Sequence, residues 1–361
     1  LAQTKYVYNT TATEIGTDDA SYTGGTFSKN PQDIILNATT AGTYYLHVLS
    51  VDEAGNKKET ISEAVTVEVA FDLPGDVDGL TYKEGDEDTG IVATDADGNE
   101  WVWVEVPKSI YTTATSDTDY DAIYKDMNTY SNDYQSMANA DTYSGNGYFN
   151  NAEEYNAEKN RMLKSVYNNH GFWISRYELG AFDAEEAASN DINVTPVSQQ
   201  NAYPIVNKTQ PQSQQIVRKM NSQANLLFGV QWRLVMKFLE VKGNMSESEL
   251  KNDSSSWGNL ENASFTIDRG QYTTDINMSS GRLSWKDATN LSKPSSSIWI
   301  LTTGAADRNK KMNIYDLAGN VSEWSLAQYF GNSLVCGDGN AYNMSVAYSY
   351  GTTRYARGFV W

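Results

Sequence analysis

The side chains that most often carry catalysis or bind transition metals are scarce in this sequence. It has two histidines, His47 and His170, in separate regions, and a single cysteine, Cys336. Neither a His/Cys zinc site nor an intrachain disulfide can be built from them, and a histidine-based triad lacks its parts. Carboxylates are plentiful, but no spacing singles out an acid/base pair. The sequence therefore nominates no catalytic residue.

Residues 329–355 carry a second kind of candidate chemistry, which is binding. Tyrosine offers rigid amphipathic surface at low entropic cost, while asparagine, serine and glycine adapt their hydrogen bonds, as in antibody paratopes. The candidate ligand-binding residues are Tyr329, Phe330, Asn332, Tyr342, Asn343, Ser345, Tyr348, Tyr350, Thr352 and Tyr355. A Tyr/Asn-rich insert at 128–150 is a second contributor. An ordinary surface loop is the alternative, because 24 tyrosines are spread over the chain.

A tight Gly-Asn turn lies between apolar residues just before Trp324, in the stretch 317–324. A large aromatic side chain buries about 150–250 Å², so we expect Trp324 in the core. An unsatisfied buried polar group costs about 1–3 kcal/mol. We therefore expect Asn320 to satisfy backbone groups and Glu323 to be a paired, buried carboxylate.

Length and charge exclude several kinds of partner. The 361 residues suffice for two domains or one large one, and the formal net charge is −19. This charge repels phosphate backbones and anionic lipid, so we expect no nucleic-acid binding. No apolar run reaches the roughly 18–20 residues that cross a bilayer, so we expect no membrane insertion within this sequence. Because it opens at Leu1 without a basic n-region, we expect an excised fragment.

The first 71 residues are predicted to form an all-β domain. Short strands are expected at 5–8, 25–28, 33–36, 43–51 and 64–71, separated by turn residues. The stretch 41–48 resembles strand F of an immunoglobulin-like domain, with Tyr44 where the tyrosine corner would be. The resemblance implies an immunoglobulin-like β-sandwich that serves as a bacterial surface spacer. An unrelated antiparallel sheet is the alternative.

Residues 72–90 are acidic and rich in glycine, which predicts a linker or an ordered surface crossing. An Asp-Gly turn between 91–94 and 101–106 predicts a β-hairpin. Caps and apolar spacing predict helices at 119–130, 152–167, 209–220 and 230–241, and brief strands are expected at 265–269 and 283–285. His170 is expected to end the second of these helices.

Two segments are more specific than this periodicity. They are Gly171-Phe172-Trp173-Ile174-Ser175-Arg176-Tyr177-Glu178 and, well downstream, Met312-Asn313-Ile314-Tyr315-Asp316-Leu317-Ala318-Gly319-Asn320-Val321-Ser322-Glu323-Trp324. Together they resemble the formylglycine-generating-enzyme/sulfatase-modifying family, a branch of the C-type-lectin-like fold. The resemblance covers residues 91–361. It implies an α+β chain in which a C-type-lectin-like domain follows the immunoglobulin-like sandwich.

The resemblance also carries implications for metals. In the enzyme branch the Gly-Asn-x-x-Glu-Trp turn contributes to a calcium site, so Asn320, the Val321 carbonyl and Glu323 are the candidate ligands here. Hard oxygen ligands suit calcium, although many relatives that are not enzymes keep the motif for its turn alone. The family's oxidase uses a cysteine pair as copper ligands after an Arg-Gly-Gly segment. Here that stretch is Arg357-Gly358-Phe359, and Cys336 stands alone upstream of it.

The sequence is therefore interpreted as a non-catalytic extracellular binding protein of a bacterial cell surface or a phage virion. The fold that the resemblance implies is also used for binding, by bacterial adhesins, phage receptor-binding proteins and variable proteins diversified by retroelements. The expected partner is a host-cell protein or glycan, and calcium is the one candidate cofactor. Two alternatives stay open: a formylglycine-generating-type copper oxidase truncated before its cysteine pair, and a purely structural surface or virion component.

Overall fold

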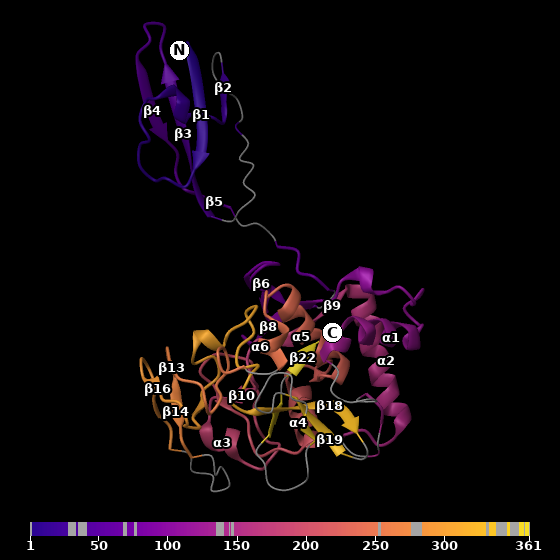
Figure 1. Ribbon diagram of the computed structural model, residues 1–361. Helices are drawn as coiled ribbons and strands as arrows, with labels where there is room; N and C mark the ends of the chain where they lie inside the picture. The colour runs from indigo at the N-terminus through magenta and orange to yellow at the C-terminus, as the bar shows by residue number, and fades with distance from the viewer. Residues whose placement is uncertain are drawn as a thin grey trace. The chain divides into compact units, whose positions relative to one another are not determined.

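Figure 1 shows the computed structural model, which divides into two compact units, Leu1–Asp72 and Leu73–Trp361. The structure describes residues 2–27, 34, 42–67, 71–75, 78–134, 141–143, 145, 148–251, 254–275, 284–329, 332–336, 345–346, 354–356 and 358–360. For residue 322 and from residue 328 onward it describes the backbone alone. The boundary between the units falls directly after the predicted end of the first domain.

The N-terminal unit is built on one antiparallel sheet. Its strands are β1 (Gln3–Asn9), β2 (Gly25–Phe27), β3 (Gly42–Val51), β4 (Lys57–Ile61) and β5 (Val65–Val67). The order is β2-β1-β3-β4, and β5 pairs with β3. The predicted strands correspond to β1, β2, β3 and β5, except that the one at 33–36 lies outside the described residues apart from Ile34. The described strands belong to one sheet, so the two-layer immunoglobulin-like sandwich stays a prediction.

Strand β4 was not predicted, and its burial shows why. Lys57, Lys58 and Thr60 are exposed, and the buried position of the strand is occupied by Glu59. The alternation that marks a half-buried strand is present, but its inward residue is a carboxylate. A search for alternating apolar residues therefore passes over it.

Glu59 is buried because it pairs with His47 on the neighbouring strand β3. The His47 Nδ1 lies 2.6 Å from Glu59 Oε1, and its Nε2 lies 3.0 Å from the Thr11 carbonyl oxygen. Both partners accept hydrogen bonds, so the ring satisfies both when both nitrogens carry protons. The Ile15 and Gly16 backbone N–H groups donate to the same carboxylate at 3.1 and 2.8 Å. The pair thus holds the loop after β1 against the sheet.

The C-terminal unit contains a six-stranded antiparallel sheet of order β12-β22-β9-β8-β7-β6. The strands are β6 (Thr81–Glu84), β7 (Val92–Thr94), β8 (Glu100–Glu105), β9 (Gly171–Ser175), β12 (Asn225–Leu226) and β22 (Gly358–Val360). Strands β7 and β8 form the predicted hairpin, with Gly98 at φ +81° in its turn. Every residue of β9 is buried, which places the sheet at the centre of the core.

Residues 72–90, predicted as a linker or an ordered surface crossing, contain an ordered strand. Residues from Leu73 onward belong to the C-terminal unit, and residues 81–84 form the edge strand β6, which pairs with β7. All four residues of β6 are exposed. A short polar edge strand has no apolar face to bury and resists pairing with other chains, so its composition resembles that of a linker.

The described α-helices of this unit are six in number. They are α1 (Tyr120–Tyr130), α2 (Ala152–Asn169), α3 (Ala184–Ala188), α4 (Gln210–Met220), α5 (Gly229–Val241) and α6 (Glu247–Lys251). Of these, α2, α4 and α5 contact strands of this sheet. The four long helices confirm the predicted ones, and the short α3 and α6 were not predicted. The capping box of Thr209 and Gln212 starts α4, and His170 ends α2 in the left-handed region at φ 58°.

Short β-ladders connect the remaining loops. They are formed by β10 (Gly180–Ala181), β11 (Tyr203–Pro204), β13 (Phe265–Thr266), β14 (Gln271–Thr273), β15 (Lys286–Asp287), β16 (Ser292–Lys293) and β17 (Ile300–Leu301). The C-terminal unit is thus a mixed α and β structure, in agreement with the predicted α+β class. Among the described residues, no helix combines the length and apolar character needed to span a membrane.

Candidate functional site

The two motif segments that are far apart in the sequence lie side by side in the structure. The Tyr315 backbone N–H donates to the Arg176 carbonyl oxygen at 2.8 Å. The Tyr177 and Tyr315 rings stack with their centroids 5.1 Å apart. Further along, the Asn320 Nδ2 donates to Glu178 Oε2 at 2.9 Å. Each segment therefore fixes the position of the other.

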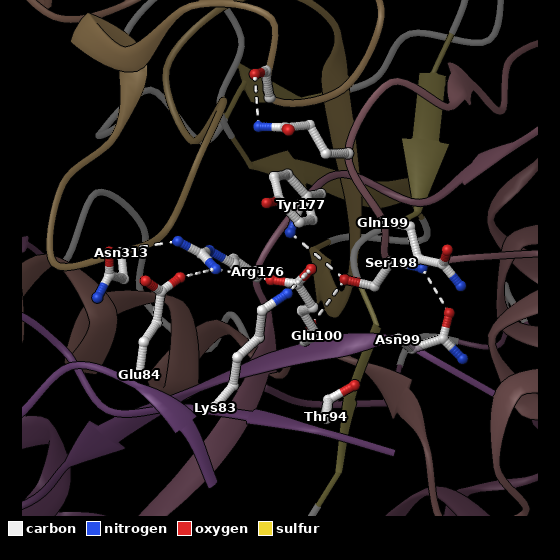
Figure 2. Close-up of polar contacts among 12 residues, drawn as sticks. Lys83, Glu84, Thr94, Asn99, Glu100, Arg176, Tyr177, Ser198, Gln199 and Asn313 are labelled. Carbon is white, nitrogen blue, oxygen red and sulfur yellow. Dashed lines mark hydrogen bonds and ion pairs between the residues drawn. The ribbon is translucent and has the colours of Figure 1, made fainter. Parts of the chain in front are cut away.

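Arg176 ties these segments to the main sheet, as Figure 2 shows. Its Nη1 lies 2.5 Å from Glu84 Oε1 and 2.6 Å from Glu100 Oε2. Lys83 Nζ approaches the other oxygen of Glu100 at 2.6 Å. Burial acts to lower the pKa of Arg176. The opposing effect of Tyr177 and the two carboxylates is larger, so the pKa is raised above its ordinary value. The guanidinium is a permanent charge that clamps β6, β8 and the end of β9.

The hydrogen bonds beside this clamp are made mainly by backbone and hydroxyl groups. The Ser198 hydroxyl donates to the Glu100 carbonyl oxygen at 2.8 Å, and the Ser198 N–H donates to Asn99 Oδ1 at 2.9 Å. These bonds attach the loop before β11 to the start of β8 (Figure 2). The ion pairs of Arg176 and the hydrogen bonds of Ser198 therefore have a structural role, which is to join β6, β8, β9 and the loop before β11.

The predicted calcium ligands lie at the next turn. Asn320 adopts the left-handed conformation at φ 59°, and its Oδ1 accepts from Asn259 Nδ2 and from the Leu301 N–H, both at 2.8 Å. An amide oxygen has two lone pairs, so a calcium ion would have to displace one of these bonds. Val321 and Glu323 are both buried. The calcium site stays a prediction.

Elsewhere, too, the described part of the chain offers little for a metal. It brings no three His, Cys, Asp or Glu side chains together in a group that could hold an ion. Asn320 instead satisfies backbone groups, as the sequence predicted, because its Nδ2 also donates to the Leu301 carbonyl oxygen at 3.2 Å.

Trp324 begins the part of the chain that carries the candidate binding residues. Its indole is half-buried rather than buried, which corrects the prediction, and it packs against the main apolar core. The Nε1 donates to the Lys208 carbonyl oxygen at 2.9 Å. The indole remains partly exposed because it covers the margin of the core.

Lys208 supports this contact and was missed by sequence reasoning. Its side chain is 4 % exposed, and Nζ donates to the carbonyl oxygens of Val206, at 3.0 Å, and Ser189. Burial lowers the pKa of Lys208 to about 8, although Asp191 and Glu186 oppose the shift. A lysine next to a helix cap gives no sequence signal of burial, so only the structure reveals it.

Trp324 belongs to a second sheet, whose strand order is β20-β19-β18-β21. Its strands are β18 (Ser322–Tyr329), β19 (Asn332–Cys336), β20 (Ser345–Val346) and β21 (Arg354–Ala356). Main-chain atoms anchor β18: the Leu326 N–H donates to the Leu227 carbonyl at 2.8 Å, and its carbonyl accepts from the Tyr155 hydroxyl at 3.2 Å. Gln210 Nε2 donates to the Ser325 carbonyl at 3.0 Å.

The strand register places four of the candidate binding residues. Tyr329 pairs with Asn332 across the β18–β19 hairpin, and Tyr355 pairs with Glu323 at the other end of β18. Ser345 starts β20 opposite Val335, near that second end. At about 3.3 Å per residue, the two ends are roughly 20 Å apart. Tyr329 and Asn332 therefore lie at one end of β18, and Ser345 and Tyr355 lie near its other end.

The other six candidates, Phe330, Tyr342, Asn343, Tyr348, Tyr350 and Thr352, lie outside the described residues. Much of the insert at 128–150 does too, but Asp141 within it is described. Its carboxylate accepts from the Gly229 and Val230 N–H groups at 2.6 and 2.9 Å. The insert thus caps helix α5, which the sequence did not suggest.

Comparison with known proteins adds no relative. No family model, no curated protein and no solved structure matches the chain. The likeness to a known family therefore rests on the motif residues themselves.

Proposed function

We propose that the chain is a non-catalytic extracellular binding protein. In this proposal, a C-type-lectin-like domain of the formylglycine-generating-enzyme type presents a Tyr/Asn/Ser-rich surface to a host-cell protein or glycan. The immunoglobulin-like N-terminal domain acts as a spacer from a bacterial cell surface or phage virion. A protein whose C-terminal residues are diversified would use the same frame.

The observation that carries the proposal is the attachment of strand β18. The strand is fixed to the core through Ser325 and Leu326, and the tyrosine-rich segment starts where the strand ends at Tyr329. A binding surface gains affinity when its frame is preorganised, because less conformational entropy is lost on association. A fixed strand that leads into aromatic and amide residues meets this requirement.

The packing of the two motif segments gives further support. The contacts of Arg176 with Tyr315 and of Glu178 with Asn320 join the segments on which the family resemblance rests. A chance occurrence of the two motifs would give no reason for them to meet. Their adjacency is what a shared structural role requires.

The test is a binding screen with the full chain on arrays of glycans and host surface proteins. Any ligand found is then titrated against the triple variant Tyr342→Ala, Tyr348→Ala and Tyr350→Ala. The matched control replaces Tyr82, an exposed tyrosine outside both this segment and the insert at 128–150, by Ala. We expect the triple variant to lose at least about tenfold in affinity, as hot-spot tyrosines do, and the control to keep it.

Retained affinity in the triple variant would place the site elsewhere. A screen that returns no ligand would favour a purely structural surface component. Tryptophan fluorescence of each variant, compared with that of the original chain, shows whether a lost affinity comes from unfolding.

A further inference from the structure

A cavity of about 220 Å³ lies in the C-terminal unit, away from the tyrosine-rich segment. Its apolar wall consists of Pro74, Ile91, Trp103 and Phe238. Trp103 is held in place by Trp173, an edge-to-face neighbour at 5.3 Å, and by the lack of a side chain at Gly171. Ligand pockets usually measure roughly 300–1,000 Å³. This cavity therefore suits one small group.

The polar part of the lining is acidic. Asp86, Glu87 and Glu105 contribute carboxylates, and no lysine or arginine lines the cavity among the described residues. Glu105 Oε2 pairs with Lys242 Nζ at 2.8 Å. In the described part of the chain, Glu87 forms no hydrogen bond or ion pair. The lining thus carries an excess of negative charge.

The turn that carries Asp86 and Glu87 is rigid. It begins at Gly85 and ends at Gly90, which have φ values of +84° and +95°. A Cβ at Gly90 would lie 2.2 Å from the Met312 carbonyl oxygen, and the Gly90 carbonyl accepts from Asn313 Nδ2 at 2.7 Å. The backbone from which Asp86 and Glu87 project is therefore fixed before any ligand arrives, which lowers the cost of binding.

His170 completes the lining from the end of helix α2. Its Nδ1 is buried and has no hydrogen-bond partner among the described residues. Burial, and secondly the charge of Lys108, lower the pKa of His170 below its ordinary value of 6.5. The lowered pKa favours the uncharged ring, which does not repel a cation, and a neutral imidazole accepts a hydrogen bond through one of its nitrogens.

We infer that this cavity binds a small alkylammonium group, of the kind found in a lysine side chain or a choline headgroup. Aromatic rings attract cations that lie within about 6 Å over their faces, and Trp103 and Phe238 are both part of the lining. The carboxylates of Glu87 and Glu105 add Coulombic attraction and disfavour anions. The methyl or methylene groups of the ligand would fill the apolar wall. This inference is independent of the proposed binding role of residues 329–355.

The experiment is a titration of the full chain followed by proton NMR of the histidine rings. The chain has two histidines, one in each unit, so His170 reports on the cavity while His47 is an internal control. The probes are choline, its neutral carbon isostere 3,3-dimethylbutan-1-ol, and n-butylammonium. We expect saturable shifts of His170 alone, with the neutral isostere at least about tenfold weaker than choline.

The two cations distinguish the kind of ammonium. Tighter binding of n-butylammonium would indicate a ligand that donates an N–H hydrogen bond, while tighter binding of choline would indicate a quaternary ligand. Either result supports the inference. Binding of the neutral isostere as tight as that of choline, or the absence of any saturable shift of His170, would overturn it.

A matched pair of variants separates the cavity from general charge. Glu87→Gln removes a carboxylate from the lining, and we expect choline binding about fivefold weaker. Asp88→Asn removes the same charge from the next residue of the turn, outside the lining, and we expect less than about a twofold effect. Equal effects of the two variants would contradict a specific site. The triple tyrosine variant of residues 342, 348 and 350 should bind choline unchanged.

Discussion

Each unit contains a buried ionic cluster, and the two clusters differ in how they are charged. In the N-terminal unit, the His47 imidazole pairs with the Glu59 carboxylate, whose pKa is held below its ordinary value by hydrogen bonds. In the C-terminal unit, the central charge belongs to Arg176, which stays protonated at any pH a protein tolerates. The first cluster holds one loop to a sheet, and the second holds three strands and a distant motif segment.

The difference shows how unit size affects the choice of buried charge. The C-terminal unit surrounds Arg176 with a large apolar core and the rings of Tyr177 and Tyr315. The small N-terminal unit has less apolar surface to bury, and hydrogen bonds around Glu59 attach residues that its core does not reach. We therefore expect the N-terminal unit to be the more sensitive to acid and the C-terminal unit to depend on the presence of Arg176.

The largest expected effect comes from Arg176→Met. It leaves Glu100 buried without its main partner, which should cost about 3–5 kcal/mol of unfolding free energy. Urea unfolding followed by tryptophan fluorescence measures it, because all nine tryptophans lie in the C-terminal unit. Lys83→Met is the control: Lys83 is exposed, so losing its bond to Glu100 should cost less than about 1 kcal/mol. Similar losses in the two variants would refute the clamp.

Trp324→Ala should cost less than a fully buried tryptophan would. The half-buried indole predicts a loss of about 2–3 kcal/mol, below the 3–5 kcal/mol of core sites. Trp324→Phe retains most of the apolar contact and removes the hydrogen bond to Lys208, so we expect about 1 kcal/mol. Thermal unfolding of both variants checks this order. A melting temperature unchanged in Trp324→Ala would show that the indole does not support β18.

Glu59→Gln sharpens the comparison within the N-terminal unit. It replaces the carboxylate that contacts His47 by a neutral amide and weakens the bonds from Ile15 and Gly16, for an expected loss of about 2 kcal/mol. The His47 ring signal in NMR follows the unfolding of this unit. The tryptophan transition of the C-terminal unit should not move. A shift of that transition would mean that the two units unfold together.

The acid response of the N-terminal unit should depend on the same carboxylate. Burial acts to raise the pKa of Glu59, but hydrogen bonds from Ile15, His47 and Gly16 lower it below its ordinary value of 4.5. A depressed pKa stabilises the folded state above pH 4.5, and this contribution is lost as the pH falls through the folded-state value. Unfolding of the N-terminal unit between pH 6 and 3 should therefore be steeper in the original chain than in Glu59→Gln. Parallel profiles would assign the acid response to other groups.

Calcium should have the smallest effect. Because both lone pairs of Asn320 Oδ1 are engaged by Asn259 and Leu301, we expect the melting temperature to be the same with calcium and with a chelator. Calorimetry of the full chain measures both. A rise with calcium that disappears in Glu323→Gln would restore the ligand set predicted from the sequence.

Local signals were sufficient to predict the long helices. The capping box of Thr209 and Gln212 at the start of α4 and His170 at the end of α2 act within a few residues of these helix ends, so the local sequence is sufficient to predict them. Strands β4 and β6 escaped prediction because their side chains are mainly polar, and a strand of this kind is stabilised by its neighbour rather than by its own pattern.

The candidate site shows the same limit more clearly. The motif residues Arg176 and Tyr315 could be selected from the sequence, but the partners of Arg176 are 76 and 92 residues away along the chain. Such pairings depend on the tertiary fold, as does the burial of Lys208. The cavity beside Trp103 combines residues from several separate segments, none of which is unusual on its own.

The attachment of β18 through main-chain atoms has a practical consequence. The carbonyl of Ser325 and the N–H and carbonyl groups of Leu326 are present whatever side chains follow them in the sequence. Randomised libraries at positions 342–352 should consequently keep a folded base, which makes the chain a natural starting point for selecting binders in the laboratory.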